Sequence, residues 1–346
     1  MTIEIAPAML RERIRGPQAW HRDSLSAADW TVPIPAECLA ELRAALAQYR
    51  GNRLPMLMLS PDEFELAACR ALMAGVKRRL DEGIMFAVLD RLPMAEMTRE
   101  EASVLYWLLA SLLARPVAQK IDGTMTYVVA DTGAKLAPGS GIRPTVTNVD
   151  LTFHNDNSYN ETPPDYVALF CQQTAKAGGV SRVVSVYTVH NQLLEEAPEL
   201  LERLYRPFWY DRHREHEEGE PNTFAAPVFE YGVFECRERL KARLALIEIR
   251  AGYTLRGETL DDTGAKALEA VQAVFDRPEL RVELDFRPGQ IQIVNNRSTG
   301  HARTAFEDHE EPDRHPALAA RPRQAGLSRL SPRSGAALIN NIACCQ

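Results

Sequence analysis

The sequence lacks the features that assign a chain to a membrane or to nucleic acid. It contains no apolar run long enough to span a bilayer, and charged residues interrupt the N-terminus where a signal peptide has its apolar region. Basic residues are not in excess, because 40 Lys and Arg stand against 47 Asp and Glu and the net charge is -7. We therefore expect a cytoplasmic protein that binds neither a membrane nor nucleic acid.

Cysteine is also scarce. The sequence has six cysteines, none of them in a Cys-x-x-Cys spacing, and most lie in apolar contexts. This pattern predicts reduced, buried thiols. The residues are Cys38, Cys69, Cys171, Cys236, Cys344 and Cys345.

No internal repeat, low-complexity tract or clear linker divides the chain. Its 346 residues, of which 45% are hydrophobic, can fill a sizeable core. We predict a single domain with three parts. These are a mixed helical N-terminal part (1–120), a mainly β core with helical insertions (121–314) and an atypical tail (315–346).

Capping signals mark helices in the first third of the chain. The stretch SPDE at residues 60–63 is a capping box with proline at the first helical position, and the apolar spacing that follows predicts a helix over 60–80. A second capping box predicts a helix over 98–113. Between them, the glycine-bounded apolar run at 83–93 predicts a buried strand.

Short β-prone segments separated by Gly, Pro and Asn follow from residue 121 onward. They are TMTYVVADT, YVALFCQQ, SRVVSVY, RVELDF and QIQIVNN. Helical apolar spacing interrupts them at residues 190–205 and 261–275. This texture predicts an α+β protein whose core is a sandwich or barrel with helices packed outside it.

One short stretch of this β-prone part could bind a metal. In FHNDNSYN (153–160), alternation along a strand end would send His154 and Asp156 to the same side while Asn155 points away. Two histidines and one carboxylate form the facial triad that holds Fe(II). The His-x-Asp pattern alone is weak, and a hydrogen-bonded loop histidine is the alternative.

A second stretch near the C-terminus supplies a third ligand. The segment NNRSTGHARTAF (295–306) follows a predicted strand and places His301 after an Asn-Asn step. Here the chain resembles the Fe(II)- and 2-oxoglutarate-dependent oxygenases of the taurine dioxygenase and clavaminate synthase-like superfamily, whose distal metal histidine lies in a segment of this form. The segment PPDYVALFC (163–171) also resembles the strand that follows the proximal metal pair in the family's free amino acid hydroxylases.

The resemblance implies a fold, a site and a reaction. The fold is a double-stranded β-helix, or jelly-roll, with flanking helices and a helical N-terminal extension. The metal ligands are His154, Asp156 and His301, and the cofactors are Fe(II), the co-substrate 2-oxoglutarate and O2. Ser181, after a Gly-Gly step and 27 residues beyond His154, and Arg314, 13 residues beyond His301, are the implied 2-oxoglutarate ligands. The reaction is hydroxylation of an unactivated C–H of a small molecule, with a free amino acid or small acid as the expected class.

Several assignments stay open at this level. Asn157, Tyr159 and Arg303 are candidate substrate residues, although turn formation or an acid partner explains them equally well. His213 and His216 lie in a charged run typical of a solvated loop, and His190 is expected to be a cap or core residue.

The reaction itself also has alternatives. The site could catalyse desaturation or cyclisation in place of hydroxylation. Prolines at 316, 322 and 332 argue against a core strand in the tail. A catalytically impaired jelly-roll member acting as a binding protein is therefore another reading. The sequence makes no prediction of oligomeric state.

Overall fold

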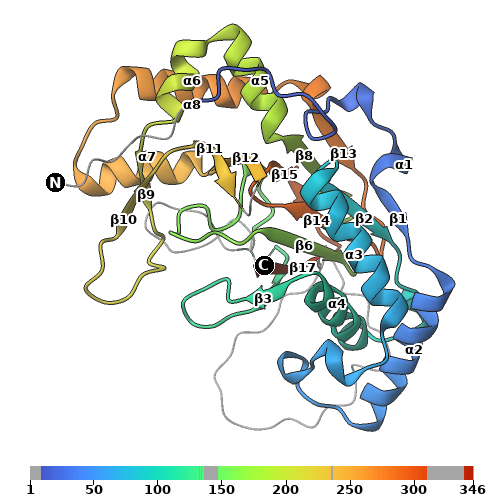
Figure 1. The fold of residues 1–346 in the computed structure, drawn as a ribbon. Coiled ribbons are helices and arrows are strands. Elements are labelled where there is room, and N and C mark those ends of the chain that lie inside the picture. The colour runs from blue at the N-terminus through green and yellow to red at the C-terminus, as the bar shows by residue number, and fades with distance from the viewer. Residues whose placement is uncertain are drawn as a thin grey trace.

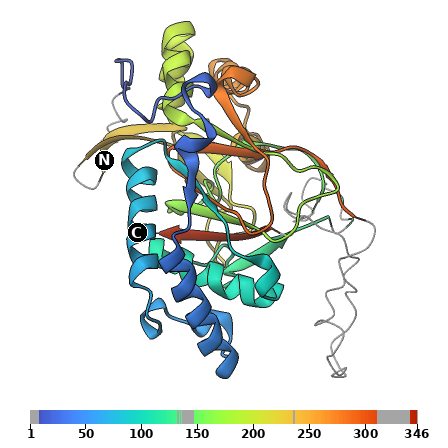
Figure 2. The same ribbon diagram turned by 90° about the vertical axis from the view of Figure 1, so that its right-hand side faces the viewer.

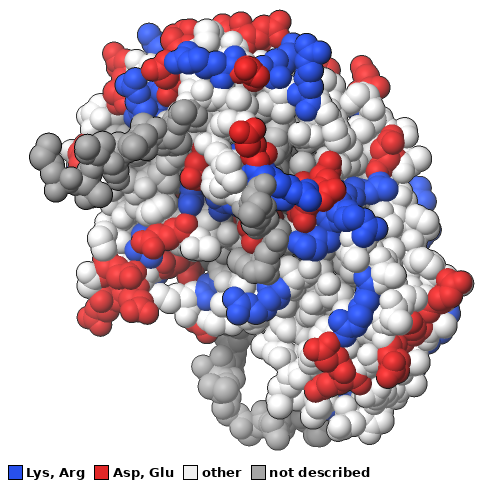
Figure 3. All heavy atoms as spheres, in the orientation of Figure 1, with Lys and Arg blue, Asp and Glu red and all other residues white. Residues whose placement is uncertain are grey.

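The computed structural model describes residues 9–131, 133, 135, 147–234 and 237–309, together with the backbone of 339–345. Two β-sheets form its centre, and helices cover them (Figure 1). Within the described ranges, no helix is long and apolar enough to cross a membrane. Acidic and basic side chains are mixed over the face in Figure 3, and neither sign covers it.

The larger sheet has seven strands. Its central strand β14 pairs antiparallel with β2 on one side and with β6 on the other, although these partners come from distant parts of the chain. The order across the sheet is β1 (Thr31–Pro33), β2 (Phe86–Asp90), β14 (Ile291–Asn295), β6 (Tyr166–Cys171), β17 (Ile339–Cys345) and β3 (Arg115–Val117), and β4 (Thr126–Val129) also pairs with β17.

The smaller sheet has four antiparallel strands and carries the metal-site candidates. Its order is β13 (Arg281–Leu284), β8 (Ser181–Ser185), β15 (Thr299–Arg303) and β5 (Leu151–His154). Three two-stranded ribbons complete the β structure. They pair β9 (Phe208–Asp211) with β10 (Thr223–Ala226), β11 (Phe229–Phe234) with β12 (Arg237–Ala242), and β7 (Ala177–Gly178) with β16 (Phe306–Glu307).

Strand alternation divides the apolar residues between two layers. In β14, Ile291 and Ile293 pack toward the helices, whereas Val294 belongs to the core between the sheets. Val183 of β8 and Val282 of β13 meet that inner core from the smaller sheet. The inner faces of the two sheets therefore share one core. A polar residue at an inward-facing position of either sheet points into this same space.

The helices form two groups, visible in Figures 1 and 2. One group packs on the outer face of the larger sheet and consists of α2 (Ala36–Gly51), α3 (Ala67–Glu82) and α4 (Arg99–Leu113). The other adjoins the smaller sheet and consists of α5 (Val186–Glu196), α6 (Pro198–Leu204), α7 (Leu246–Arg256) and α8 (Asp262–Phe275). The short helices are α1 (Ala27–Trp30) and the 3-10 turns Arg22–Ser24, Met56–Met58, Pro61–Glu63, Met94–Glu96 and Pro278–Leu280.

Two helices differ from their predicted bounds. The capping box at Ser60 caps only a 3-10 turn, and α3 begins at Ala67, because the Glu41 carboxylate of α2 accepts hydrogen bonds from the backbone N–H groups of Ala68 and Cys69. The helix predicted over 190–205 is two helices separated at Ala197, since Pro198 cannot donate a backbone hydrogen bond to continue the first. The helix capped by Thr98 and the buried strand β2 are confirmed.

The C-terminal tail contains a strand that the sequence argument did not predict. The backbone of β17 pairs antiparallel with β6, β3 and β4, so the prediction of a tail without a core strand is wrong for residues 339–345. All three prolines that motivated it precede Ile339 in the sequence, and the strand itself contains neither Pro nor Gly.

Candidate metal centre

The smaller sheet brings the two halves of the predicted metal site together. His154 is the last residue of β5, Asp156 follows two residues later, and His301 is the central residue of β15. Since β5 and β15 are antiparallel neighbours with His301 directly opposite His154, their imidazoles lie on the same face. The ring centroids are 4.4 Å apart.

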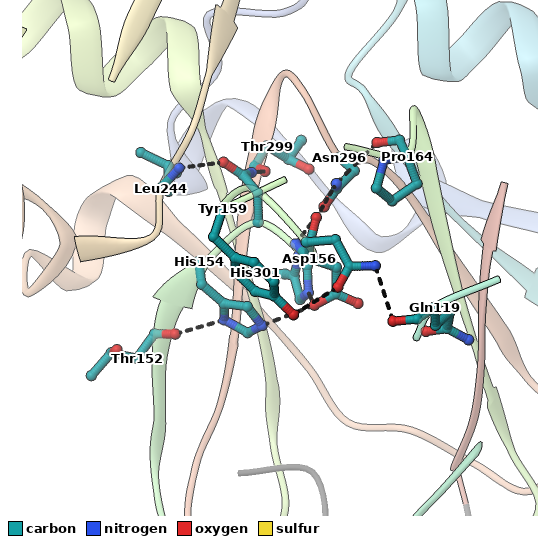
Figure 4. A network of polar contacts seen from close by, with 12 residues as sticks. Gln119, Thr152, His154, Asp156, Tyr159, Pro164, Leu244, Asn296, Thr299 and His301 are labelled. Atoms are coloured by element: carbon teal, nitrogen blue, oxygen red, sulfur yellow. Dashed lines mark hydrogen bonds and ion pairs between the residues drawn. The ribbon is translucent and has the colours of Figure 1, made fainter. Parts of the chain in front are cut away.

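The Asp156 carboxylate lies between the two histidines (Figure 4). Its Oδ1 is 3.2 Å from Nε2 of His154 and 3.4 Å from Nε2 of His301. One ligand atom from each residue lies within 4.8 Å of the others, and these three form the group of potential metal ligands found in the described part of the chain. Three donors converge on one point, as a facial triad requires.

Hydrogen bonding prepares these side chains for a cation. Nδ1 of His154 is 2.9 Å from the carbonyl oxygen of Thr152, to which it donates, so Nε2 is the ring nitrogen that faces the shared point. Burial opposes ionisation of Asp156, yet hydrogen bonds from His154 and His301 hold the pKa of Asp156 well below its usual range. An ionised carboxylate and two imidazoles with inward Nε2 atoms are a donor set that suits Fe(II).

Asn155 does not join the triad. Its side chain accepts from the backbone N–H of Leu244 at 2.7 Å and donates to the carbonyl of Thr299 at 2.6 Å. It thereby ties the end of β5 to β15 and to the segment that leads into α7. The predicted alternation, with Asn155 pointing away from the metal pair, is confirmed.

A buried pocket between the sheets adjoins the triad. Ser181 lies in it, directly opposite Arg303 in the pairing of β8 with β15. The Ser181 hydroxyl donates to Oε1 of Gln292 at 2.7 Å, while Nε2 of Gln292 has no hydrogen-bond partner within the described residues. Apolar side chains from both sheets close the pocket, namely Val129, Leu151, Leu169 and Phe286.

Arg303 is a buried cation in this pocket. Its side chain donates to the carbonyls of Thr147 and Val149, at 3.1 Å and 3.0 Å, and its guanidinium lies 4.4 Å from the ring centroid of Phe306. Burial lowers the pKa of Arg303 to about 10, which leaves it charged at neutral pH. Within the described residues its Nε has no hydrogen-bond partner, and the charges of Asp150 and Asp308 favour its protonated form. The pocket can therefore accept an anionic group.

The Gly-Gly step before Ser181 has a steric cause. Gly178 has a φ of +72°, and a Cβ there would overlap the carbonyl oxygen of Ala305, the residue just before the facing strand β16. The close approach of β7 and β16 thus requires glycine at this position. After this step the chain enters β8, where Ser181 lies opposite Arg303 of β15, the strand that contains His301.

The candidate substrate residues lie beyond the metal pair. The Tyr159 hydroxyl donates to the Asn157 side chain at 3.0 Å, and Asn157 donates to the carbonyl of Gln119 at 3.4 Å. The ring of Tyr159 contacts His213 edge-on, with centroids 4.9 Å apart, and His213 is 3.1 Å from the carboxylate of Glu248. Burial acts to lower the pKa of His154, but the hydrogen bond and charge of Asp156 raise it overall, with a smaller contribution from the charge of Glu248.

The sequence reading missed several of these contacts. Gln292 and Glu248 carry no motif. The charged run around His213 predicts a solvated loop, yet the imidazole of His213 reaches Glu248 and Tyr159. Only the positive φ of His213, +50°, marks it as unusual, and this angle is not readable from sequence. His190 is a core residue as predicted, hydrogen-bonded to Tyr205 at 2.7 Å. Arg314 lies outside the described residues.

Comparisons with known proteins agree with this geometry. The family model described as taurine catabolism dioxygenase TauD, TfdA family matches residues 54–317. FR-33289 synthase of Streptomyces rubellomurinus is 28% identical over 306 residues, which cover 88% of this chain and 87% of the synthase.

Solved structures share the fold. An asparagine oxygenase in complex with Fe(II), 2S,3S-3-hydroxyasparagine and succinate matches with a TM-score of 0.59 and 21% identity, covering 91% of this chain and 93% of the other. The non-heme iron oxygenase OrfP in complex with Fe and alpha-ketoglutaric acid matches with a TM-score of 0.56 and 13% identity, covering 91% and 94%.

Proposed function

The chain belongs to the TauD, TfdA family and is a 2-oxoglutarate-dependent non-haem iron dioxygenase, and we propose that it hydroxylates a free amino acid or a related small acid at an unactivated C–H. The observation that carries this proposal is the convergence of His154, Asp156 and His301 beside a buried pocket with a cation. The solved asparagine oxygenase of similar fold holds a hydroxylated amino acid, which supports the substrate class.

The three converging residues are the proposed metal ligands. Their donor set, two imidazoles and one carboxylate, leaves one face of an octahedral ion open for other ligands. When bound, iron and 2-oxoglutarate supply the oxidising power that transfers an oxygen atom from O2 to the substrate. The smaller sheet carries these ligands, and with the larger sheet that faces it, it fits a double-stranded β-helix, which we propose as the detailed fold.

The pocket with Ser181 is the proposed 2-oxoglutarate side of the centre. The Ser181 hydroxyl can donate a hydrogen bond to a carboxylate, and the Arg303 guanidinium offers it a positive charge. The apolar walls exclude water, which would weaken the hydrogen bond and the charge interaction. Arg303 lies on this side and not with Asn157 and Tyr159, so we assign it to the co-substrate. By its spacing in the sequence, Arg314 is a second candidate for the same role.

The opposite side, with Tyr159, His213 and Glu248, is the proposed substrate side. Glu248 lies in the first turn of α7, and its side chain is 21% exposed. Burial acts to raise the pKa of Glu248, but the hydrogen bond from His213 acts to lower it, and the pKa is lowered overall. The carboxylate is therefore ionised at neutral pH. A carboxylate at this position suits the ammonium group of an amino acid.

Substrate-dependent turnover tests the proposal. Anaerobic protein loaded with Fe(II) and 2-oxoglutarate is exposed to O2 with a panel of amino acids and small organic acids, and succinate, carbon dioxide and product mass are measured. We expect one member to raise succinate release and to gain one oxygen atom. Loss of two hydrogens in its place would indicate desaturation or cyclisation. Tight binding of a small molecule with no decarboxylation under any condition would favour an impaired binding protein.

Glu248→Gln is expected to weaken the use of an amine-bearing substrate. Removing the charge costs a charge-assisted hydrogen bond, on the order of 1.5–3 kcal/mol, so KM should rise roughly ten- to a hundredfold. The 2-oxoglutarate requirement should not change. Glu258→Gln is the matched control, since Glu258 lies just beyond α7 and pairs with Arg256. An unaltered KM in Glu248→Gln would remove Glu248 from the substrate side.

A further inference from the structure

The Asn-Asn step before His301 contains two buried amides with different partners. Asn295 donates to the carbonyl of Leu80 at 3.1 Å and accepts from the N–H of Arg297 at 3.0 Å, so it serves the sheet and its own turn. Asn296, fully buried, turns toward Asp156. Its Oδ1 accepts from the Asp156 N–H at 2.9 Å, and its Nδ2 donates to the Asp156 carbonyl at 2.9 Å (Figure 4).

These two hydrogen bonds act on both peptide groups that flank the Asp156 Cα. Fixing the N–H before a Cα and the carbonyl after it fixes φ and ψ of that residue, and with them the direction of its Cα–Cβ bond. Strand β5 ends at His154, so Asp156 lies beyond the ladder that orients the histidine. The Asn296 side chain makes the two backbone hydrogen bonds to Asp156 that a neighbouring strand would otherwise make.

Further contacts make Asn296 a rigid support. Its Nδ2 also donates to the carbonyl of Pro164 at 3.0 Å, and its backbone N–H donates to the carbonyl of Asp165 at 2.8 Å. Arg243 holds the later part of the same loop through the carbonyls of Ser158, Asn160 and Glu161. Asn296 holds the Asp156 backbone itself, on both sides of its Cα.

The position of Asn296 also links the two halves of the metal site. It lies five residues before His301, in the turn between β14 and β15, and Thr299, the first residue of β15, closes that turn by donating to the carbonyl of Asn295 at 2.8 Å. A displacement of Asp156 relative to His301 would require this turn to open.

We propose that Asn296 is a positioning residue that sets the Asp156 carboxylate for metal binding without touching the metal. The inference rests on the proposed metal triad and adds to it a residue that orients one ligand through its backbone. Groups that orient metal ligands typically contribute 10- to 100-fold to metal affinity. We expect an effect of this size when Asn296 loses its donor.

The variant Asn296→Asp tests the proposal. It keeps the size of the side chain and an acceptor for the Asp156 N–H, but it places a carboxylate oxygen against the carbonyls of Asp156 and Pro164. The matched control is Asn295→Asp, the same change at the adjacent buried amide. Co(II) is titrated into each metal-free protein, the visible spectrum of the bound ion reports ligand geometry, and the melting temperature without metal reports stability.

We expect Asn296→Asp to bind Co(II) ten- to a hundredfold more weakly than the wild type and with an altered spectrum. Asn295→Asp should lose stability but keep the wild-type affinity and spectrum. If Asn296→Asp does not fold, Asn296→Ser replaces it, because serine has a shorter side chain with a single hydroxyl. We again expect ten- to a hundredfold weaker Co(II) binding and an altered spectrum.

Three results separate this inference from the proposed function. Wild-type affinity and spectrum in the Asn296 variant would overturn the positioning role. Equal weakening in both variants, in step with their melting temperatures, would also overturn it, because the effect would then be general loss of structure. Failure of the wild-type protein to bind Co(II) would overturn the metal centre itself.

Discussion

Replacing Asp156 with alanine is expected to abolish both iron retention and 2-oxoglutarate decarboxylation. Asp156 supplies the anionic oxygen between the two imidazoles, and two neutral imidazoles alone would hold Fe(II) weakly. Changes to groups that only orient ligands cost about 10- to 100-fold in metal affinity, so the loss of a ligand should exceed that range. Iron content after desalting and succinate release measure the two effects.

Asp23→Ala is the control for this experiment. Asp23 is exposed, lies in the 3-10 turn Arg22–Ser24 and is outside the converging group. Its variant should retain iron and turn over like the wild type. Should Asp156→Ala keep iron and activity at wild-type levels, the assignment of the triad would be wrong.

Replacing Arg303 with methionine is expected to weaken 2-oxoglutarate binding while iron binding persists. If Arg303 pairs with a carboxylate of the co-substrate, its removal leaves that charge in an apolar pocket without a cation, a loss on the order of 2–5 kcal/mol. Ser181→Ala removes one hydrogen bond to a charged group and should cost less, on the order of 1.5–3 kcal/mol. Titration of 2-oxoglutarate into the anaerobic Fe(II) protein, followed by the metal-to-ligand charge-transfer band, measures both.

Two further arginine variants sharpen the result. Arg182 lies on the neighbouring strand β8, points to the surface and pairs with Glu283 at 3.0 Å, so Arg182→Met should bind 2-oxoglutarate normally. Arg314→Met tests the arginine chosen by sequence spacing. Loss of affinity in Arg314→Met with none in Arg303→Met would assign the carboxylate to Arg314 and leave Arg303 as a support for the carbonyls of Thr147 and Val149.

The sequence predicted much of the scaffold, because its signals there are local. The capping box at Thr98 and the β-prone run QIQIVNN that contains β14 depend on residues within a few positions of one another, and both elements formed as predicted. The start of α3 could not be predicted in this way, because its cap comes from Glu41, a residue of another helix. A distant side chain thus decided where that helix begins.

The candidate site follows the same division. His154 and Asp156 were found because a period of two places both side chains on one face, and His301 was found through a resemblance to family motifs. Gln292 and Glu248 could not be found, since a lone polar residue in an apolar strand or a helix turn gives no local sign of what it will face. The Asn-Asn step was recognised as a motif, but the partner of Asn296 became visible only when β14 and the loop after β5 were placed side by side.

The central place of β14 in the larger sheet has a consequence for the synthesis of the protein. On the ribosome, β2, β6, His154 and Asp156 emerge first. The strand β14 begins 135 residues after Asp156, counted as 291 minus 156, and His301 lies 145 residues after Asp156, counted as 301 minus 156. At translation speeds of roughly 5–20 residues per second, about 7–30 s separate the two halves of the metal site. During this interval β2 and β6 lack the strand that joins them, and the nascent chain has no complete triad. Iron loading is therefore a late step, confined to chains whose sheet has already closed around β14.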